Sequence, residues 1–474
     1  MDAAWLAMLG VVGVGSLVGG VYWSAVLREV VLSMRQLPTA RDGLAAAQRH
    51  EAKAHGHAGA WPTVCVIVPA YNEERVIATL ARSLVRQDYP AGRLSLVFAL
   101  DRCTDATAER IAQATAGSGV EVQTLRITRC AQGWSGKVHA VWHAVNHAQP
   151  ARQADLLLFV DADTELEPQC LRATVALLLE NDLAMVSLGS TLARRFWFER
   201  LVQPVTSYEL LRQFPPRKVN RRGGRGRRAV ANGQYMLFRR EAYQAVGGHA
   251  AVREALLEDL MLAKALRQHG LALGFYLAAG LLHCRMYDGF AAFVSGWKRI
   301  YQELSHRRPR RLKRFSLALL LTDLAMPGAM VGAVGLGALA WAQGGASAAQ
   351  AWAAAAVAGV GAVAYAVYLG ALVTGCVWGR TPAWNALSQP VGAAITAWIL
   401  WRAAVDLESG VETRWGGRTY KREPRFEGDH WPWQAYGTVP GWYRRRVQEA
   451  ARAAPDAGDA QAAPAAEATS PARA

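Results

Sequence analysis

The sequence predicts an α/β domain, with a mostly parallel sheet flanked by helices, joined to transmembrane α-helices. Between residues 61 and 314, short runs rich in β-branched residues or leucine alternate with charged, helix-like segments. This alternation is typical of a parallel sheet. Long uncharged stretches lie outside that region, although the chain has a net charge of +16 and 52% hydrophobic residues. This composition excludes a disordered chain.

Four strands and two helices are the clearest elements expected in the α/β region. The strands are residues 64–68, 94–100, 120–125 and 156–160, and the helices are residues 73–87 and 105–116. Residues 156–160 read Leu-Leu-Leu-Phe-Val, a continuous apolar run expected of a strand that is buried on both faces.

Apolar segments on both sides of this region are long enough to cross a bilayer. Residues 3–27 have no charge, which suits a helix across a hydrocarbon core of about 30 Å. A cleaved signal peptide would need a basic start and a small-residue cleavage site, so we favour a retained anchor. Residues 324–379 are also uncharged, and the turn-like sequence at 343–347 divides them into two expected spans. Residues 381–401 contain Pro390, and we expect an interfacial or re-entrant helix there.

Charged residues indicate the orientation of the chain. Five Lys or Arg residues follow the first apolar segment between residues 28 and 53, whereas only Asp2 precedes it. Cytoplasmic flanks are rich in Lys and Arg, so the α/β domain is expected in the cytoplasm, at the inner (plasma) membrane. The six cysteines form no C-x-x-C pair, which fits reduced cytosolic thiols. The expected parts are a transmembrane anchor (1–30), the α/β domain (61–314), membrane helices (315–405), a basic cytosolic tail (406–450) and a disordered tail (451–474).

Two aspartates, Asp161 and Asp163, follow the strand expected at 156–160. Alternation along a strand puts both on one side, at the carboxyl end where open α/β sheets bind ligands. Two carboxylates there suit Mg2+ or Mn2+, which in turn binds a diphosphate. Taken alone, such a pair is more often a polar loop with a helix-capping aspartate.

Further motifs accompany the aspartates in a defined order. They are Pro-Ala-Tyr-Asn-Glu-Glu at 69–74, Asp-Arg-Cys-Thr-Asp at 101–105, Gly-Lys at 136–137, Asp-Ala-Asp at 161–163 and Glu-Asp at 258–259. In this order the chain resembles the membrane-bound family 2 glycosyltransferases over residues 62–301. The resemblance implies the GT-A fold, a Rossmann-like and mostly parallel sheet flanked by helices, and a nucleotide-sugar donor.

The resemblance also implies roles on the donor side of the site. The implied nucleotide-sugar contacts are Pro69, Tyr71, Glu73, Asp101, Lys137 and Asp161. Asp163 is the implied principal ligand of Mg2+ or Mn2+, beside Asp161. A carboxylate accepts hydrogen bonds from a base N–H or ribose hydroxyls, and lysine offers charge to phosphate. The alternative for Glu73 and Asp101 is turn-forming and helix-capping chemistry.

On the acceptor side, the resemblance implies that Gly233 and Gln234 border the bound acceptor and that Asp259 of the Glu258-Asp259 pair is the catalytic base. A hydroxyl nucleophile must lose its proton as it attacks the anomeric carbon, so the chemistry requires a base near it. Taken alone, Glu-Asp at the start of a helix is more often a favourable charge at the positive end of the helix dipole.

Trp297, Lys298 and Arg299 lie where processive members of the family have Gln-x-x-Arg-Trp, which this chain lacks. The three residues are expected to clamp a diphosphate or to lie at the lipid surface. The missing motif favours transfer of a single sugar. The sequence Trp-Gly-Gly-Arg at 415–418 resembles a piece that follows the final helices of lipid-directed relatives, and it indicates a cytoplasmic location.

Two basic clusters, residues 212–228 and 298–314, raise the question of a nucleic-acid partner. No recognised nucleic-acid module accompanies them, and both belong to a chain with bilayer-length apolar segments. Anionic headgroups attract such clusters, so we expect a bilayer contact and no nucleic acid; a solvated loop is the alternative for residues 212–228.

The sequence thus predicts an inverting, metal-dependent hexosyltransferase that moves one sugar from a nucleotide-diphospho-sugar to a lipid hydroxyl. The expected donor is a UDP-sugar. The nearest relatives by resemblance act on hopanoids, carotenoids or ceramide. A processive polysaccharide synthase is the first alternative, and a non-catalytic membrane scaffold is the second.

Overall fold

The computed structural model describes residues 3–53, 61–213, 220, 229–343, 347–379 and 381–425, which belong to one compact unit of the chain. Most of the basic cluster at 212–228 lies outside the described residues. So do residues 426–450 of the expected basic tail and the tail expected to be disordered at 451–474.

A seven-stranded sheet forms the centre of the α/β region, in the order β3-β2-β1-β4-β8-β6-β9. The strands are β1 (Val64–Ala70), β2 (Leu94–Asp101), β3 (Glu121–Ile127), β4 (Leu156–Val160), β6 (Met185–Gly189), β8 (Tyr235–Arg239) and β9 (Leu273–Leu277). All neighbours are parallel except β8, which is antiparallel to both β4 and β6. The predicted mostly parallel sheet is therefore confirmed.

Helices flank the sheet because each presents an apolar stripe to it. In α3 (Ile77–Val85), the buried residues Ile77, Leu80, Ala81 and Leu84 recur every three or four positions and join the core that contains β1 and β2. The other flanking helices are α4 (Thr107–Thr115), α5 (Gly136–His147), α6 (Gln149–Gln153), α7 (Cys170–Glu180), α11 (Arg240–Ala245) and α12 (Glu258–Gln268). β4 is buried at every position, as its apolar run predicts.

Two small sheets complete the strands. A three-stranded sheet pairs β5 (Thr164–Leu166), β10 (Leu282–Cys284) and β7 (Thr191–Leu192) in that order. A hairpin of β11 (Thr413–Trp415) and β12 (Arg418–Tyr420) follows the last helix, and Gly416 and Gly417 both adopt positive φ at its turn.

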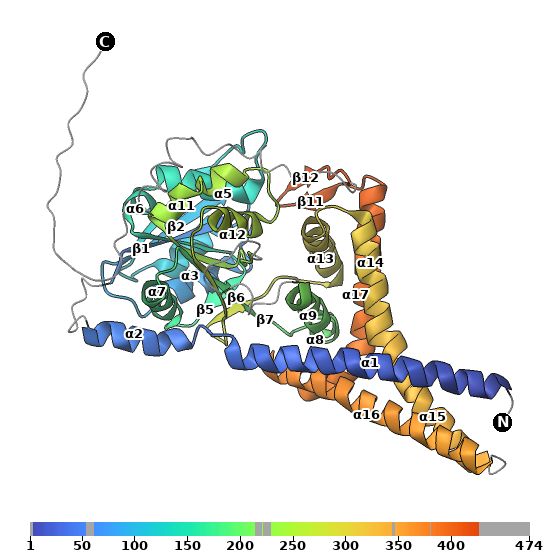
Figure 1. The fold of residues 1–474 in the computed structure, drawn as a ribbon. Coiled ribbons are helices and arrows are strands. Elements are labelled where there is room, and N and C mark those ends of the chain that lie inside the picture. The colour runs from blue at the N-terminus through green and yellow to red at the C-terminus, as the bar shows by residue number, and fades with distance from the viewer. Residues whose placement is uncertain are drawn as a thin grey trace, which may run out of the picture. The chain divides into compact units, whose positions relative to one another are not determined.

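Three helical segments are long and apolar enough to cross a membrane: α1 (Ala3–Gln36), the continuous run Pro309–Gln343, and α16 (Ala348–Trp378). The run comprises α14 (Pro309–Leu320), a π-helical turn at Leu321–Ala325 and α15 (Met326–Gln343). Ser347 caps the first turn of α16, so the second of the two expected spans begins at the predicted break. Residues 344–346 of that break lie outside the described residues. α1 packs along α15 and α16 (Figure 1).

Small residues allow the apolar helices to pack closely. A methyl group at Gly361 of α16 would lie 2.7 Å from the carbonyl oxygen of Met330 in α15, which is the close approach that glycine permits between apolar helices. α17 (Gln389–Glu408) is not among the candidate spans and packs against α14 and α13 (Phe290–Leu304). The interfacial or re-entrant helix expected at 381–401 stays a prediction.

Candidate functional site

A cavity of about 570 Å3 opens at the carboxyl ends of β1, β2 and β4. Because these strands are parallel, the residues that end them converge there, as open α/β sheets require of a binding site. The predicted site residues that line the cavity are Pro69, Tyr71, Glu73, Asp101, Lys137, Asp161, Asp163, Gly233, Gln234, Glu258, Asp259 and Arg299. Residues up to 230 positions apart in the chain therefore share one cavity, which we call the catalytic cavity.

Lys137 joins two carboxylates at the base of the catalytic cavity. Its Nζ lies 2.6 Å from Asp161 Oδ1 and 2.7 Å from Glu258 Oε1. Burial alone would lower the pKa of Lys137, but the two carboxylates outweigh burial and raise it. Burial likewise opposes ionisation of Glu258, and Lys137 holds the pKa of that carboxyl below its usual value. The lysine is therefore charged at neutral pH and fixes the relative positions of β4, α5 and α12.

Two further carboxyl groups, those of Glu73 and Asp163, lie near Asp161 in the same cavity. Burial, and then the charges of Asp163 and Asp161, raise the pKa of Glu73 to about 8. Burial and Asp161 raise the pKa of Asp163 to about 6. Asp163 Oδ1 is buried and accepts no hydrogen bond. Such a crowded acidic group favours binding of a cation, because a cation lowers the cost of ionising all three.

Asp259 sits in the first turn of α12, opposite Gly233. Its Oδ2 accepts a hydrogen bond from the Gly233 amide at 2.8 Å, and its Oδ1 accepts one from the Leu260 amide at 2.7 Å. Burial and the charge of Glu258 raise its pKa to about 6. The carboxylate is therefore mostly ionised at neutral pH yet basic enough to take a proton.

Gly233 packs closely against the charged side chains of the cavity, where a side chain of its own would crowd them. A methyl group there would lie 3.1 Å from Lys137 Nζ, 3.3 Å from Glu258 Oε1 and 3.4 Å from Asp259 Oδ2. The preceding residue, Asn232, anchors the segment through hydrogen bonds from its amide nitrogen to Leu188 O at 2.9 Å and Gln234 Oε1 at 3.1 Å. Asn232 thus fixes the backbone that brings Gly233 next to Lys137, Glu258 and Asp259.

Residues 62–295 match the model of the family described as "Glycosyltransferase like family 2". They form a family 2 glycosyltransferase domain. The 4,4'-diaponeurosporenoate glycosyltransferase of Staphylococcus aureus strain USA300 is 27% identical over 258 residues, which are 53% of this chain and 64% of that protein. The chain thus spans just under two thirds of the length of this curated relative.

Solved structures resemble this chain at lower identity. The mannosyltransferase PcManGT from Pyrobaculum calidifontis, in complex with GDP-Man and Mn2+, is 18% identical, with 81% of this chain and 98% of that chain covered and a TM-score of 0.41. Glucosyl-3-phosphoglycerate synthase from Mycobacterium tuberculosis, in complex with Mn2+, UDP and phosphoglyceric acid, is 20% identical, with 52% and 79% covered and a TM-score of 0.33.

At the end of β2 in the family 2 domain, Asp101 forms an ion pair with the next residue, Arg102. Arg102 donates from Nε to Asp101 Oδ1 at 2.9 Å and from a terminal nitrogen to Oδ2 at 2.7 Å, and its guanidinium lies 5.3 Å from the centre of the Tyr71 ring. Arg102 and Asn72 both adopt a φ of 54°, an uncommon conformation for residues other than glycine. Such conformations cluster at functional sites.

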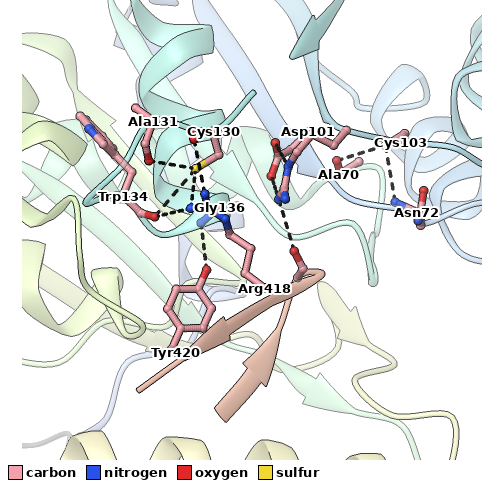
Figure 2. A network of polar contacts seen from close by, with 12 residues as sticks. Ala70, Asn72, Asp101, Cys103, Cys130, Ala131, Trp134, Gly136, Arg418 and Tyr420 are labelled. Carbon is pink, nitrogen blue, oxygen red and sulfur yellow. Dashed lines mark hydrogen bonds and ion pairs between the residues drawn. The ribbon is translucent and has the colours of Figure 1, made fainter. Parts of the chain in front are cut away.

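The C-terminal hairpin forms a wall of the catalytic cavity that the sequence did not predict (Figure 2). Arg418 donates to the Trp134 carbonyl at 2.8 Å and to Cys130 Sγ at 3.0 Å. The Tyr420 hydroxyl accepts from the Gly136 amide at 3.2 Å, and the Gly416 carbonyl accepts from Arg102 at 3.4 Å. The hairpin therefore holds the loop that leads into Lys137.

Two predicted residues are not brought to the catalytic cavity. Trp297 is buried between Phe293 and Tyr301 on α13, where the three rings form part of an apolar cluster. Lys298 pairs instead with Asp406 of α17 at 2.5 Å. Arg299, the third residue of the motif, does line the cavity, and its guanidinium lies 4.4 Å from the centre of the Trp415 ring.

The segment after β10 also contributes to the site, which the sequence did not predict. Arg285, Tyr287 and Asp288 line the catalytic cavity, and the Arg285 amide donates to the carbonyl of Asp163 at 2.9 Å. The available signal was the tripeptide Arg285-Met286-Tyr287 at the end of a short apolar run, which is too weak alone to mark a site.

Proposed function

We propose that this family 2 glycosyltransferase is an inverting enzyme that transfers one sugar from a nucleotide-diphospho-sugar, specifically a UDP-sugar, to a lipid hydroxyl. The observation that supports it most is that Asp259, a half-buried carboxylate with a pKa of about 6, lies in one cavity with the acidic and basic donor-side residues. A general base needs this combination of access and basicity.

In the proposed reaction, Asp259 takes the proton of the acceptor hydroxyl as its oxygen bonds to the anomeric carbon. The bond between that carbon and the diphosphate oxygen breaks at the same time, and the nucleoside diphosphate leaves with the electron pair. Attack from the face opposite the leaving group inverts the anomeric configuration. Asp259 is held by two backbone amides, which orient its carboxylate. No acid is needed for the leaving group, because a diphosphate is already a stable anion.

We assign the metal to Asp163, with Asp161 beside it, and Mg2+ or Mn2+ as the ion. Hard divalent cations prefer carboxylate oxygens, and the orphaned Asp163 Oδ1 fits this role. Within the described residues no group of three or more His, Cys, Asp or Glu is arranged to hold a metal alone, so the donor diphosphate would supply further ligands. The ion would neutralise charge on the departing diphosphate.

The remaining donor-side residues would bind the nucleotide. Tyr71 offers a ring beside the Arg102 guanidinium, and Asp101 and Glu73 offer acceptors to the base and ribose. Lys137 would act on the donor through charge. It already bridges two carboxylates, so its first effect is to hold Asp161 and Glu258 in place.

The proposed location is the inner (plasma) membrane, with the catalytic domain in the cytoplasm and the parts divided at the boundaries given above. Three apolar helices support membrane association, and the excess of Lys and Arg after residues 3–27 supports the orientation. The lipid acceptor is supported by the same helices. A processive synthase is the alternative, which the missing Gln-x-x-Arg-Trp disfavours; a non-catalytic scaffold would have no need of the carboxylate set.

Mass spectrometry of lipid extracts tests this proposal directly. Cells that contain the protein should hold a lipid with one added hexose that is absent from cells with the Asp259→Asn variant. A ladder of products with many hexoses would refute single-sugar transfer, and identical extracts from both strains would refute lipid glycosylation.

A further inference from the structure

A second cavity, of about 460 Å3, lies between the family 2 domain and two of the candidate membrane helices. Its lining includes Val30 and Met34 of α1, residues 371, 372 and 375–378 of α16, and residues 189–192 at the ends of β6 and β7. Arg194, Glu199 and residues of α9 (Gln203–Gln213) add a polar side. Mainly apolar side chains face it from α1 and α16, whereas Ser190 and Thr191 contribute hydroxyl groups from the domain. A cavity with one apolar and one polar side suits an amphiphile.

The domain side of this second cavity borders the catalytic cavity. Ser190 lines the second cavity and Asn232 lines the catalytic one, and the Asn232 amide nitrogen lies 3.3 Å from Ser190 Oγ as a hydrogen-bond donor. The residue after Asn232 is Gly233, whose amide contacts Asp259. A single side-chain hydrogen bond therefore separates the second cavity from the neighbourhood of the proposed base.

The helix side of the second cavity is tied to the domain by backbone pairing. The chain that leaves α1 forms a parallel bridge between Thr39 and Leu277 of β9, and the Ala40 amide donates to the Leu277 carbonyl at 2.8 Å. Thr39 and Leu277 both line the cavity. The space is thus bounded by a hydrogen-bonded junction of α1 with the sheet, and α1 and α16 are both long and apolar enough to cross a membrane.

We infer that the second cavity binds the apolar chain of the acceptor lipid, with the acceptor hydroxyl directed past Ser190 and Asn232 towards Asp259. This inference rests on the proposed function and adds to it where the chain of the lipid lies. The expected occupant is therefore a lipid of the long-chain alcohol class. It would enter from the bilayer between α1 and α16, because these helices form the wall of the cavity that a membrane would surround.

Gly375 offers a way to fill the second cavity without disturbing its walls. It lines the cavity, and a methyl group added to it would meet no atom within 4 Å. Gly370 of the same helix is equally open but does not line the cavity. Gly375→Trp should therefore occlude the site, and Gly370→Trp is a matched control with the same added bulk.

The test uses the full chain in nanodiscs of phosphatidylethanolamine and phosphatidylglycerol, with a diazirine-labelled hexadecanol as the photoreactive probe. Peptide mass spectrometry should place the label on residues 189–192 and 371–378. Labelling there should fall by about tenfold in Gly375→Trp, because the indole would occupy the space that the probe needs and the probe would have to overpack it, and should persist in Gly370→Trp. Label confined to exposed positions such as Val363, or unchanged labelling in Gly375→Trp, would overturn the inference.

Competition separates this site from bound membrane lipid and from the proposed function. Unlabelled hexadecanol should displace the probe, whereas loss of cavity labelling as the phosphatidylglycerol fraction of the nanodisc is raised would assign the cavity to a bilayer phospholipid and overturn the acceptor role. UDP binding, measured on the same samples by calorimetry with Mn2+, should be equal in both variants and the wild type. Wild-type protein that is labelled in the cavity but binds no UDP would refute a UDP-sugar as the donor, and the apolar site would still be supported.

Discussion

Replacement of Lys137 by methionine should destabilise the family 2 domain strongly. Its Nζ contacts Asp161 and Glu258 at 2.6 and 2.7 Å, and only 4% of the Glu258 side chain is exposed. Removing one partner of a buried ion pair costs about 3–5 kcal/mol. We expect the lower end, about 3 kcal/mol, because 26% of the Asp161 side chain is exposed and water screens part of its charge. For a domain of roughly 150–250 residues, this lowers Tm by about 6–12 °C.

Tryptophan fluorescence of the detergent-solubilised protein during heating measures this change. Lys421→Met, which removes an exposed lysine, is the control and should leave Tm unchanged. The double variant Lys137→Met/Glu258→Gln should recover part of the loss, because the glutamine removes one of the two carboxylates left without a cation. A Lys137→Met protein that melts within about 1 °C of the wild type would refute the argument that Lys137 neutralises buried carboxylates.

The other predictions concern turnover and the donor. Asp259→Asn should lower transfer by about 100- to 10,000-fold while UDP affinity, measured by calorimetry, stays the same; an active variant would remove Asp259 as the base. Because the base acts ionised and its pKa is about 6, wild-type kcat should fall as pH drops through about 6, and a flat profile from pH 5 to 8 would contradict this. Asp163→Ala should abolish Mn2+-dependent UDP binding, whereas unchanged metal dependence would exclude it as a ligand. Arg418→Ala should raise the donor KM with little change in kcat, because the side chain holds the loop before Lys137 without touching the reacting atoms; Lys421→Ala is its control, and equal KM values would refute the role of the hairpin.

Strand ends were the part of the site that sequence could predict. Asp101 and Asp161 each end or follow an apolar run, and parallel strands bring such positions to one edge of the sheet. The strands expected at 64–68, 94–100, 120–125 and 156–160 are confirmed to within a few residues. Lys137 and Asp259 needed the family resemblance as well, since each stands at a helix start with no periodic pattern to mark its side chain.

The remaining features of the site depend on contacts between distant parts of the chain, which the local sequence pattern does not reveal. The hairpin at 413–420 reaches the catalytic cavity after the membrane helices, nearly 300 positions from its partners near Gly136. Trp297 and Lys298 lie on the face of α13 that packs towards α17. Their orientation therefore depends on the position of α17, which the local sequence of α13 does not reveal. The pairing of Asp101 with Arg102 depends on the left-handed backbone at Arg102, which is unexpected for arginine.

The central claim is that this chain moves one sugar from a nucleotide-sugar to a lipid. The most direct measurement is mass spectrometry of the products formed when the purified chain in nanodiscs receives UDP-hexose, Mn2+ and the lipid extract of its own cells. We expect a single lipid species heavier by one hexose, formed with stoichiometric UDP and absent when EDTA is present. UDP release without a glycosylated lipid, or a series of products with increasing hexose number, would contradict it.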